Sequence, residues 1–555
     1  MDGRSPAVCL TPSSPKKLSF DDLLLEAGGF GRFQVLTLMI LCIPRLILPQ
    51  NFLLHIFISS VPSHHCAIFP NELMGNLTKE DLLLVYIPRE VDGAYSSCKM
   101  YSQPQLHLLH NNSEVTANKS SLKSCDQGWE YDHSTFISTT ATQWDLICER
   151  KWLNSALATF FFIGVTMGAI CIGYLSDRYG RRTMLLICYI LSFVFGSLSA
   201  VSISYTMLAV CRTLCGMSLA GLSITTVALS VEWVDMRHRT FAEIITGMFW
   251  SVGSVSLALM AYLLRDWHWL LGAVTAPCLL GIISIWWLPE SARWLLANGK
   301  VEKAEAELAR CAVVNGQIYE KSSMNKRIQT LLEHRPPSGS PSYIDLFRTP
   351  ALRKLSLCLA LIWFGVASSY YGISLNITGF GLSMYLTHCL YGLIEFPAKL
   401  GIYVLMNWLG RRWTQVLVLM GTAVCIGANM IIPMAFGSLR SAVAIIGKGF
   451  SEASFTSIIL YTAEIYPTII RQNGIGYASF VGRLGVSVAP MIMLLEDVWL
   501  ILPQTLFCCL AVTGGLVANL LPETQNVQLP ETISDVESKR CIGADVYCGR
   551  CAAQE

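Results

Sequence analysis

Long apolar stretches with no charged residue dominate the chain. Three such stretches run between Trp152 and Ser176, between Val498 and Pro522, and from Leu355 to Ile394. A helix needs about 20 apolar residues to cross a bilayer. Only helices and closed barrels satisfy their backbone groups in lipid, and these stretches are too long and do not alternate as barrel strands do. The pattern predicts an all-α polytopic membrane protein with twelve transmembrane helices.

Composition and charge agree with this prediction. Of the 555 residues, 53% are hydrophobic and 14% are charged, and the mean hydropathy is +0.48. Soluble domains carry roughly a quarter charged residues, so an ordinary soluble enzyme is excluded. The net charge of +2 gives no support for nucleic-acid binding. We therefore expect the lipid bilayer, and no nucleic acid, as a partner.

Basic residues predict the orientation of the spans. Arg178, Arg181 and Arg182 follow the second span, Arg411 and Arg412 follow the eighth, and loops on the other side are short and nearly neutral. Cytoplasmic loops carry the excess of Lys and Arg, so both termini are expected in the cytoplasm. The expected segments are a cytoplasmic N-terminal segment 1–32, a six-helix half 33–290, linker helices 291–353, a second six-helix half 354–521, and a cytoplasmic tail 522–555.

One external loop, 61–150, is much longer than the others. It contains four of the twenty cysteines, and an even number in a secretory-side loop predicts two disulfides, with three connectivities left open. They are Cys66, Cys98, Cys125 and Cys148. The loop also holds three sequons for N-glycosylation. Their acceptors are Asn76, Asn111 and Asn118.

An internal repeat predicts that the twelve spans form two halves. Gly180-Arg181-Arg182 after the second span recurs as Gly410-Arg411-Arg412 after the eighth. Glu232 is matched by Glu464, and Pro289-Glu290 by Pro522-Glu523. All three correspondences have nearly the same spacing along the chain, so the fold is predicted as a duplicated six-helix unit.

The loop motif Gly-x3-Asp-Arg-x-Gly-Arg-Arg at Gly173–Arg182 resembles that of the major facilitator superfamily. The resemblance implies a site near the bilayer midplane between two halves that rock alternately inward and outward. Asp177 can pair with arginines at neighbouring helix ends and so hold one conformer. If the motif served only to set the membrane topology, that would explain its arginines, but it would explain neither Asp177 nor Gly180. In the second copy, Asn407 stands in place of the acid. The gating candidates are Asp177, Arg178, Gly180, Arg181, Glu232, Arg239, Glu464 and Arg471.

Several further runs resemble the organic cation and organic anion transporter family. They are Gly29–Gln34, Gln143–Cys148, Pro289–Leu295, Tyr461–Thr468 and Leu529–Ile533. The resemblance covers residues 20–537. The runs 447–452 and 481–485, with Arg45 in the first span, narrow it to one group within the organic-anion branch.

Charged residues inside spans are expensive and therefore mark function. Glu395 and Lys399 lie four positions apart, as do Lys448 and Glu452, so each pair could neutralise itself along one helix face. Arg483 has no acid within four residues, and Arg45 is equally unaccompanied. A guanidinium in such a place would attract a carboxylate and hold it in a bidentate fork.

The family resemblance implies roles for these residues. Lys399 and Arg483 match the lysine and arginine that attract anionic substrates, and the cation branch has an acid at the second position. An opposing reading gives Arg483 a permanent partner such as Glu452 or Glu395. Arg212 is read as a gating or structural arginine. The substrate-site candidates are Arg483, Lys399, Tyr370, Tyr371, Trp250, Phe455, Asn51 and Arg45.

These observations predict a plasma-membrane carrier of small organic anions (carboxylates, nucleotides, nucleobases, urate-like solutes) that works by alternating access, through exchange or facilitated diffusion. We expect one chain as the functional unit, no cofactor and no metal; a basolateral location in an epithelium is one option. No catalytic constellation or nucleotide-binding domain is recognised, and Cys548-x2-Cys551 lacks a second pair for zinc. The alternatives are a carrier of cations or zwitterions, and a receptor that keeps the fold without transporting, against which Asp177 and Gly180 argue.

Overall fold

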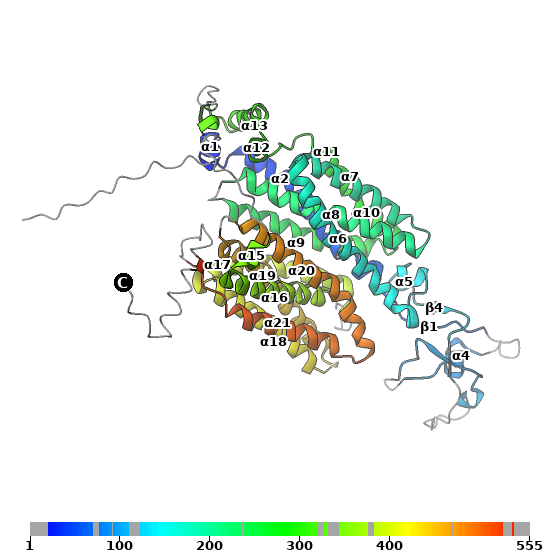
Figure 1. The fold of residues 1–555 in the computed structure, drawn as a ribbon. Helices are drawn as coiled ribbons and strands as arrows, with labels where there is room; N and C mark the ends of the chain where they lie inside the picture. The colour runs from blue at the N-terminus through cyan, green and yellow to red at the C-terminus, as the bar shows by residue number, and fades with distance from the viewer. Residues whose placement is uncertain are drawn as a thin grey trace, which may run out of the picture.

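The computed structural model describes residues 20–525, 536 and 537, except positions 70–76, 91–92, 110–121, 236–237, 319–323, 325, 331–342, 376–381, 434 and 468–469. Within these residues, eleven helices are long and apolar enough to cross a membrane, and a twelfth apolar helix, α21 (Leu502–Ala518), is shorter. The predicted all-helical architecture with twelve spans is confirmed (Figure 1).

The first six spans make up one bundle, drawn from blue to green in Figure 1. Ser204 begins the fourth span by accepting a hydrogen bond from the Met207 N–H, the usual function of a serine N-cap. Pro277 begins the second segment of the sixth span, where its missing N–H costs nothing. The helices are α2 (Arg32–Phe52) with α3 (His55–Ile58), α6 (Lys151–Tyr179), α7 (Arg181–Ala200), α8 (Tyr205–Trp233), α9 (Arg239–Leu263), and α10 (Trp267–Thr275) with α11 (Pro277–Ser284).

The last six spans make up the second bundle. Ser383 caps α17 by accepting a hydrogen bond of 3.3 Å from the Leu386 N–H. Pro397 lies inside the same helix. The helices are α16 (Pro350–Leu375), α17 (Met384–Leu409), α18 (Arg411–Ile431), α19 (Gly437–Ile465), α20 (Arg471–Met493) with the 3-10 turn η4 (Leu494–Asp497), and α21.

Small residues let the helices pack closely. A Cβ atom added to Gly164 of α6 would lie 2.0 Å from the carbonyl oxygen of Thr213 on α8, and one on Gly168 would lie 2.2 Å from that of Met217. Close backbone approach of this kind is how membrane helices gain van der Waals contact. Between the bundles, α6 packs against α20 and α9 packs against α17. These two helix pairs place residues of both halves side by side at the centre of the molecule.

Short helices gather at one end of the bundles: α1 (Phe20–Glu26), α12 (Ala292–Ala297) and α13 (Val301–Val314) (Figure 1). The carboxylate of Asp21 on α1 pairs with Arg293 on α12 and, at 3.4 Å, with Arg239 at the start of α9. A further short helix, α15 (Asp345–Arg348), precedes α16. The N-terminal segment and the linker are thus tied to the first half by a shared carboxylate.

The long loop after the first span forms a small domain at the opposite end (Figure 1). Two antiparallel pairs organise it: β1 (His64–Cys66) with β4 (Trp129–Tyr131), and β2 (Lys99–Tyr101) with β3 (Leu122–Ser124). Thr78 caps the helix that follows the first strand. The helical pieces are α4 (Lys79–Tyr86), η2 (Leu106–Leu109), α5 (Thr140–Gln143) and η3 (Cys148–Arg150).

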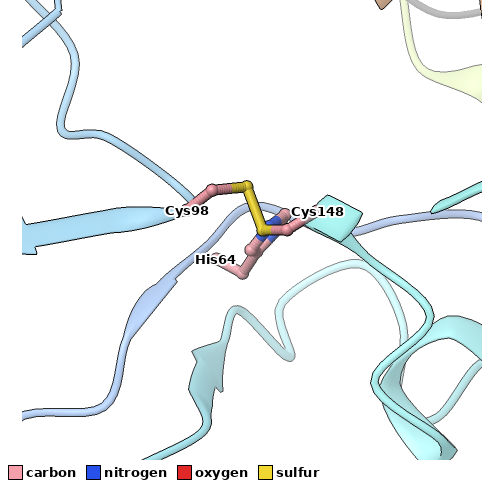
Figure 2. A group of neighbouring side chains, drawn as sticks. All are labelled: His64, Cys98 and Cys148. Atoms are coloured by element: carbon pink, nitrogen blue, oxygen red, sulfur yellow. A yellow bond between two sulfur atoms is a disulfide. The ribbon is translucent and has the colours of Figure 1, made fainter. Parts of the chain in front are cut away.

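Two disulfides close this domain and select one of the three connectivities. Cys66 is bonded to Cys125, and Cys98 to Cys148. His64 lies beside the second disulfide (Figure 2), but both sulfurs there are bonded to each other, so they offer no thiolate to a metal. The three sequon asparagines, Asn76, Asn111 and Asn118, lie outside the described residues.

Candidate functional site

Four buried charged side chains from α17 and α19 meet where the second half packs against α9 of the first. The Lys399 Nζ atom lies 3.4 Å from Glu395 Oε2 and 3.1 Å from Glu452 Oε1. The Lys448 Nζ atom lies 3.6 Å from Glu395 Oε1. Lys448 and Glu452, which could have paired along α19, each form an ion pair with a residue of α17 instead. We call these four residues the charge cluster.

The charge cluster also binds the first half. Lys399 donates hydrogen bonds to Ser251 Oγ (2.7 Å) and to the carbonyl oxygen of Gly247 (3.1 Å), both on α9. Ser251 in turn donates to Glu395 Oε2 at 2.8 Å. Each carboxylate and ammonium is therefore paired, and the cluster, with two acids and two lysines, has no net charge when all four are ionised.

Tyr370 of α16 covers the charge cluster. Its hydroxyl donates to Glu395 Oε1 at 2.8 Å, and the Lys448 Nζ atom lies 3.1 Å from the centroid of its ring. An ammonium over an aromatic face is stabilised by the ring quadrupole. Lys448 also donates to Ser374 Oγ at 2.7 Å. Lys448 is thereby held inside the second half, whereas Lys399 reaches across to the first.

Arg483 of α20 has a different environment. Its guanidinium donates to the carbonyl oxygen of Ser479, one turn earlier on its own helix, at 3.3 Å, and it faces Tyr371. Within the described part of the chain, no carboxylate forms an ion pair with it. The opposing reading, in which Glu395 or Glu452 occupies Arg483, does not hold here, because both acids are paired with lysines.

Aromatic side chains link the two halves beside Arg483. Tyr370 and Tyr371 contact each other with ring centroids 5.1 Å apart, and Phe455 of α19 lies 5.5 Å from Tyr370. Phe162 of α6 packs edge-on against Tyr371 at 5.2 Å. Trp250 of α9 lies close to Tyr370, and its ring packs edge-on against Phe52 with centroids 6.0 Å apart. The structure therefore brings together all four aromatic candidates, with contributions from both bundles.

Arg45 and Asn51, two further site candidates on α2, have partners far along the sequence. Arg45 forms an ion pair with Glu243 of α9 at 2.9 Å. The expectation that it has no acidic partner is therefore wrong. Asn51 binds Arg212 of α8 through its side-chain and backbone oxygens, at 3.3 and 3.1 Å. Both residues thus serve contacts within the first half.

Arg212 is fully buried in this half. It contacts His55 Nε2 at 3.3 Å, and its guanidinium lies 4.4 Å from the ring centroid of Phe161. Among the described residues it has no carboxylate partner. Its contacts with α2 and α6 agree with a structural role on α8.

The loop motif of the first half forms a closed network. Arg181 at the start of α7 pairs with Asp177 (2.6 Å) and with Glu232 at the end of α8 (3.1 Å). Glu290 accepts hydrogen bonds from the N–H groups of Arg181 and Arg182, which no helical carbonyl can reach. Gly180 has φ +105°, and a Cβ atom there would lie 2.6 Å from Glu290 Oε2, so the motif requires glycine.

The second copy reproduces this network with other partners. Arg411 pairs with Glu464 at 2.9 Å, and Glu523 accepts from the N–H groups of Arg411 and Arg412. Gly410 has φ +83° and a Cβ clash with Glu523 at 2.6 Å. Where the first copy has an acid, the backbone oxygen of Asn407 binds Gln525 instead. Each of these networks closes within its own half.

The three other gating candidates are placed as follows. Arg178 lies over the ring of its neighbour Tyr179. Arg239 binds Asp21 and the carbonyl oxygen of Val234. Arg471 donates to the carbonyl oxygen of Tyr466.

Contacts that the sequence does not predict join the two halves at the end that carries the disulfide-bonded domain. Lys151 at the start of α6 pairs with Asp497 of η4 at 2.6 Å. Tyr385 of α17 stacks on Phe57 of α3, with ring centroids 5.7 Å apart and planes at 5°, and its hydroxyl donates to the Thr135 carbonyl oxygen. His388 approaches Ser254 of α9 at 3.4 Å. A histidine in an apolar span was the one signal that could have indicated this junction.

A duplicated bundle of twelve spans, with a buried charge cluster and an aromatic layer between the halves, defines a membrane carrier of the major facilitator type. Residues 106–534 match the model of the family described as sugar (and other) transporter. The chain is 47% identical to solute carrier family 22 member 7 from Rattus norvegicus over 95% of this chain and 100% of that one, and 47% identical to its Homo sapiens counterpart over 94% and 97%. Member 6 from Pseudopleuronectes americanus is 37% identical over 94% and 95%.

The chain therefore belongs to the sugar (and other) transporter family and, within it, to solute carrier family 22. The resemblance to the organic cation and organic anion transporter family is confirmed. The narrower resemblance to one group within the organic-anion branch is confirmed as well: that group is organic anion transporter 2, which is member 7. The inward-open structure of the xylose transporter XylE from E. coli matches with a TM-score of 0.59 and 16% identity, over 90% of this chain and 98% of that one, which supports the fold.

Proposed function

We propose that this carrier moves small organic anions (carboxylates, nucleotides, nucleobases and urate-like solutes) across the plasma membrane by alternating access. The observation that carries the proposal is the charge at the centre. The charge cluster is balanced, with two carboxylates against two ammonium groups. Arg483, whose guanidinium contacts the carbonyl oxygen of Ser479 one turn earlier on α20, adds a positive charge that no described carboxylate offsets. An excess of positive charge where the two halves meet favours anions.

Arg483 is also chemically suited to the task. A guanidinium presents two parallel N–H groups to a carboxylate or phosphate and holds it in a bidentate fork. One Nη1 contact with a backbone carbonyl leaves other N–H donors for a ligand. Tyr371 and Phe455, with Trp250 and Phe162 from the first half, would bind the flat apolar part of such a solute.

Lys399 supplies the link between substrate and motion in this proposal. Like Glu395, it contacts both α9 and α19, and its bonds to Gly247 and Ser251 hold the two halves together at their centre. An anion that draws Lys399 toward Arg483 would weaken those bonds and favour separation of α9 from α17. Exchange or facilitated diffusion is part of the proposal, because the bound anion itself would shift the balance between the two conformers.

The proposal also includes the orientation of the chain in the membrane. The loop motifs and the α1, α12 and α13 helices lie at one end, and the disulfide-bonded domain lies at the other. Disulfides form in secretory compartments and at cell surfaces, which supports an external position for residues 61–150 and a cytoplasmic one for both termini.

The proposal is tested by uptake of a panel of labelled anions and cations into cells that express the chain, with unlabelled external solute as competitor. Labelled anions should enter, unlabelled anions should compete, and external anion should accelerate the efflux of labelled anion from loaded vesicles. A receptor without transport would bind but show no accelerated efflux. Uptake restricted to cations would contradict the proposal.

A matched pair of variants assigns the effect to the centre. Arg483→Gln removes the unpaired positive charge and should lower anion uptake. Arg265→Gln removes an exposed arginine that contacts the Ser134 carbonyl oxygen in the external domain, and it should leave uptake unchanged. Surface abundance of both variants, measured by biotinylation, separates loss of transport from loss of protein.

A further inference from the structure

A cavity of about 290 Å³ lies inside the second half, away from the junction of the two bundles. Its walls come from five helices of that half, α16, α17, α18, α19 and α21. Most of the lining is apolar, including Ile373, Ile426 and Phe507. An engineered apolar cavity of about half this volume is large enough to bind benzene, so this one has room for a compact organic molecule.

Polar atoms without partners face the cavity. The Tyr391 side chain is 1% exposed, and its hydroxyl has no hydrogen-bond partner among the described residues. The Oδ1 atom of Asn429, near the end of α18, is also buried without a partner there. Both residues line the cavity. Leaving a buried polar atom unpaired costs about 1–3 kcal/mol, so a native structure that keeps two of them beside one cavity points to a ligand that satisfies them.

One end of the cavity is positively charged. Arg440, in the first turn of α19, and Gln504, in the first turn of α21, line it beside Leu500 and Ile501. The guanidinium has five N–H donors, so a contact with the protein leaves donors for an anionic group. At the inner end, Tyr391 lies two turns into α17 and Gly447 three turns into α19. The cavity is therefore elongated, with an apolar body and hydrogen-bonding groups at both ends.

We infer that this cavity is a second binding site, distinct from the transport path, for a compact amphiphile with an apolar body and an anionic head. The head binds Arg440, the body packs against Ile373, Ile426 and Phe507, and polar atoms of the ligand pair with Asn429 and Tyr391. Because every lining residue belongs to the second half, the ligand stays with this half when the two bundles rock.

The site also adjoins the charge cluster. Gly447 precedes Lys448, Gly372 follows Tyr371, and Tyr391 lies one turn before Glu395 on the same helix. A ligand that orders this wall constrains the backbone beneath the cluster. Occupancy is therefore expected to change the rate of transport without competing for Arg483.

The test uses the purified full chain in lipid nanodiscs with two probes, decanoate and decanol, each carrying a photoreactive diazirine. Crosslinked peptides are identified by mass spectrometry. Decanoate should label peptides that contain Met430 and Phe507, which line the cavity. Ala444→Phe, which fills the cavity, should lower this labelling roughly tenfold, and Ile373→Phe is a second filling variant in case the first fails to fold. Leu439→Phe, on an exposed position of the same helix, is the matched control and should not change it.

Two further variants separate this site from the proposed transport site. Arg440→Gln should lower decanoate labelling roughly tenfold, as expected for loss of a charge-assisted contact, and should not affect decanol. Arg483→Gln should leave labelling of the cavity unchanged, whether or not it alters anion transport. Labelling spread over lipid-facing helices, or equally reduced by Leu439→Phe, overturns the second site. Equal decanol labelling in the parent chain overturns the anionic head.

Discussion

The Lys399 Nζ atom lies 3.1 Å from Glu452 Oε1 on the neighbouring helix α19. The same ammonium contacts Glu395 on its own helix and two groups on α9 of the other half. A single buried cation therefore connects three helices and both bundles. Such a network is stable only while every member has a partner, because an unpaired charge in this setting is strongly destabilising.

Glu395→Gln should destabilise the protein. The substitution leaves two buried lysines with only Glu452 as an acid, and removal of one partner from a buried pair typically costs about 3–5 kcal/mol. Thermal unfolding in detergent, followed by size-exclusion chromatography, measures the loss.

The double variant Glu395→Gln/Lys448→Met serves as the control for this prediction. It restores one acid to one lysine and should recover most of the lost stability. Glu496→Gln, in the exposed η4 turn, should have no effect. If the double variant is no more stable than the single one, the account of the cluster as a balanced network is wrong.

Tyr385→Ala should loosen the junction at the external ends of the two halves. It removes the stacking on Phe57 and the hydrogen bond to Thr135, whereas the exposed pair Lys151–Asp497 is worth at most about 1 kcal/mol. A cysteine placed at Ser254 should therefore react faster with an impermeant thiol reagent in the Tyr385→Ala background. Asp497→Asn should change this rate much less, and a larger effect of Asp497→Asn than of Tyr385→Ala would contradict the assignment.

The linker helix α13 should show a pH dependence caused by Glu307. Burial raises the pKa of this carboxyl above its ordinary value, and Arg310 and Arg182 only partly offset the effect. A carboxyl with a raised folded-state pKa stabilises the folded form below its ordinary pKa of 4.5, and this contribution is lost as the pH rises through the folded value. α13 should therefore be better protected from hydrogen exchange at acidic than at neutral pH.

Glu307→Gln should remove this difference and raise the protection of α13 at neutral pH, after correction for the intrinsic exchange rate. Glu302→Gln, on an exposed position of the same helix, should retain the pH dependence of the parent. Persistence of the dependence in Glu307→Gln would assign it to another group.

The spans and the duplication could be predicted because their signals are local. Apolar runs mark the helices, and the loop motif repeats with Gly180 and Gly410 in the strained positions that only glycine tolerates. Partners were harder to predict because they depend on how helices face one another. Arg45 and Glu243 are 198 residues apart, so no local pattern reveals the pair.

The charge cluster shows the same limit. Spacing of four residues suggested Lys448 with Glu452, but Lys448 binds Glu395 of α17 because the two helices face each other there. The number of disulfides followed from the cysteine count, whereas their pairing required the fold. The cavity inside the second half left no trace in the sequence, since its lining residues, mostly apolar with a few polar ones, are spread over five helices and the loops between them.

Whether the charge of residue 483 selects the substrate is measured by the ratio of anion to cation uptake in Arg483→Asp, compared with Arg483→Lys and the parent chain at equal surface abundance. Arg483→Lys should keep the preference for anions, and Arg483→Asp should lower the ratio at least about tenfold, which corresponds to roughly 1.4 kcal/mol. An unchanged ratio in Arg483→Asp would show that the charge of residue 483 does not select the substrate.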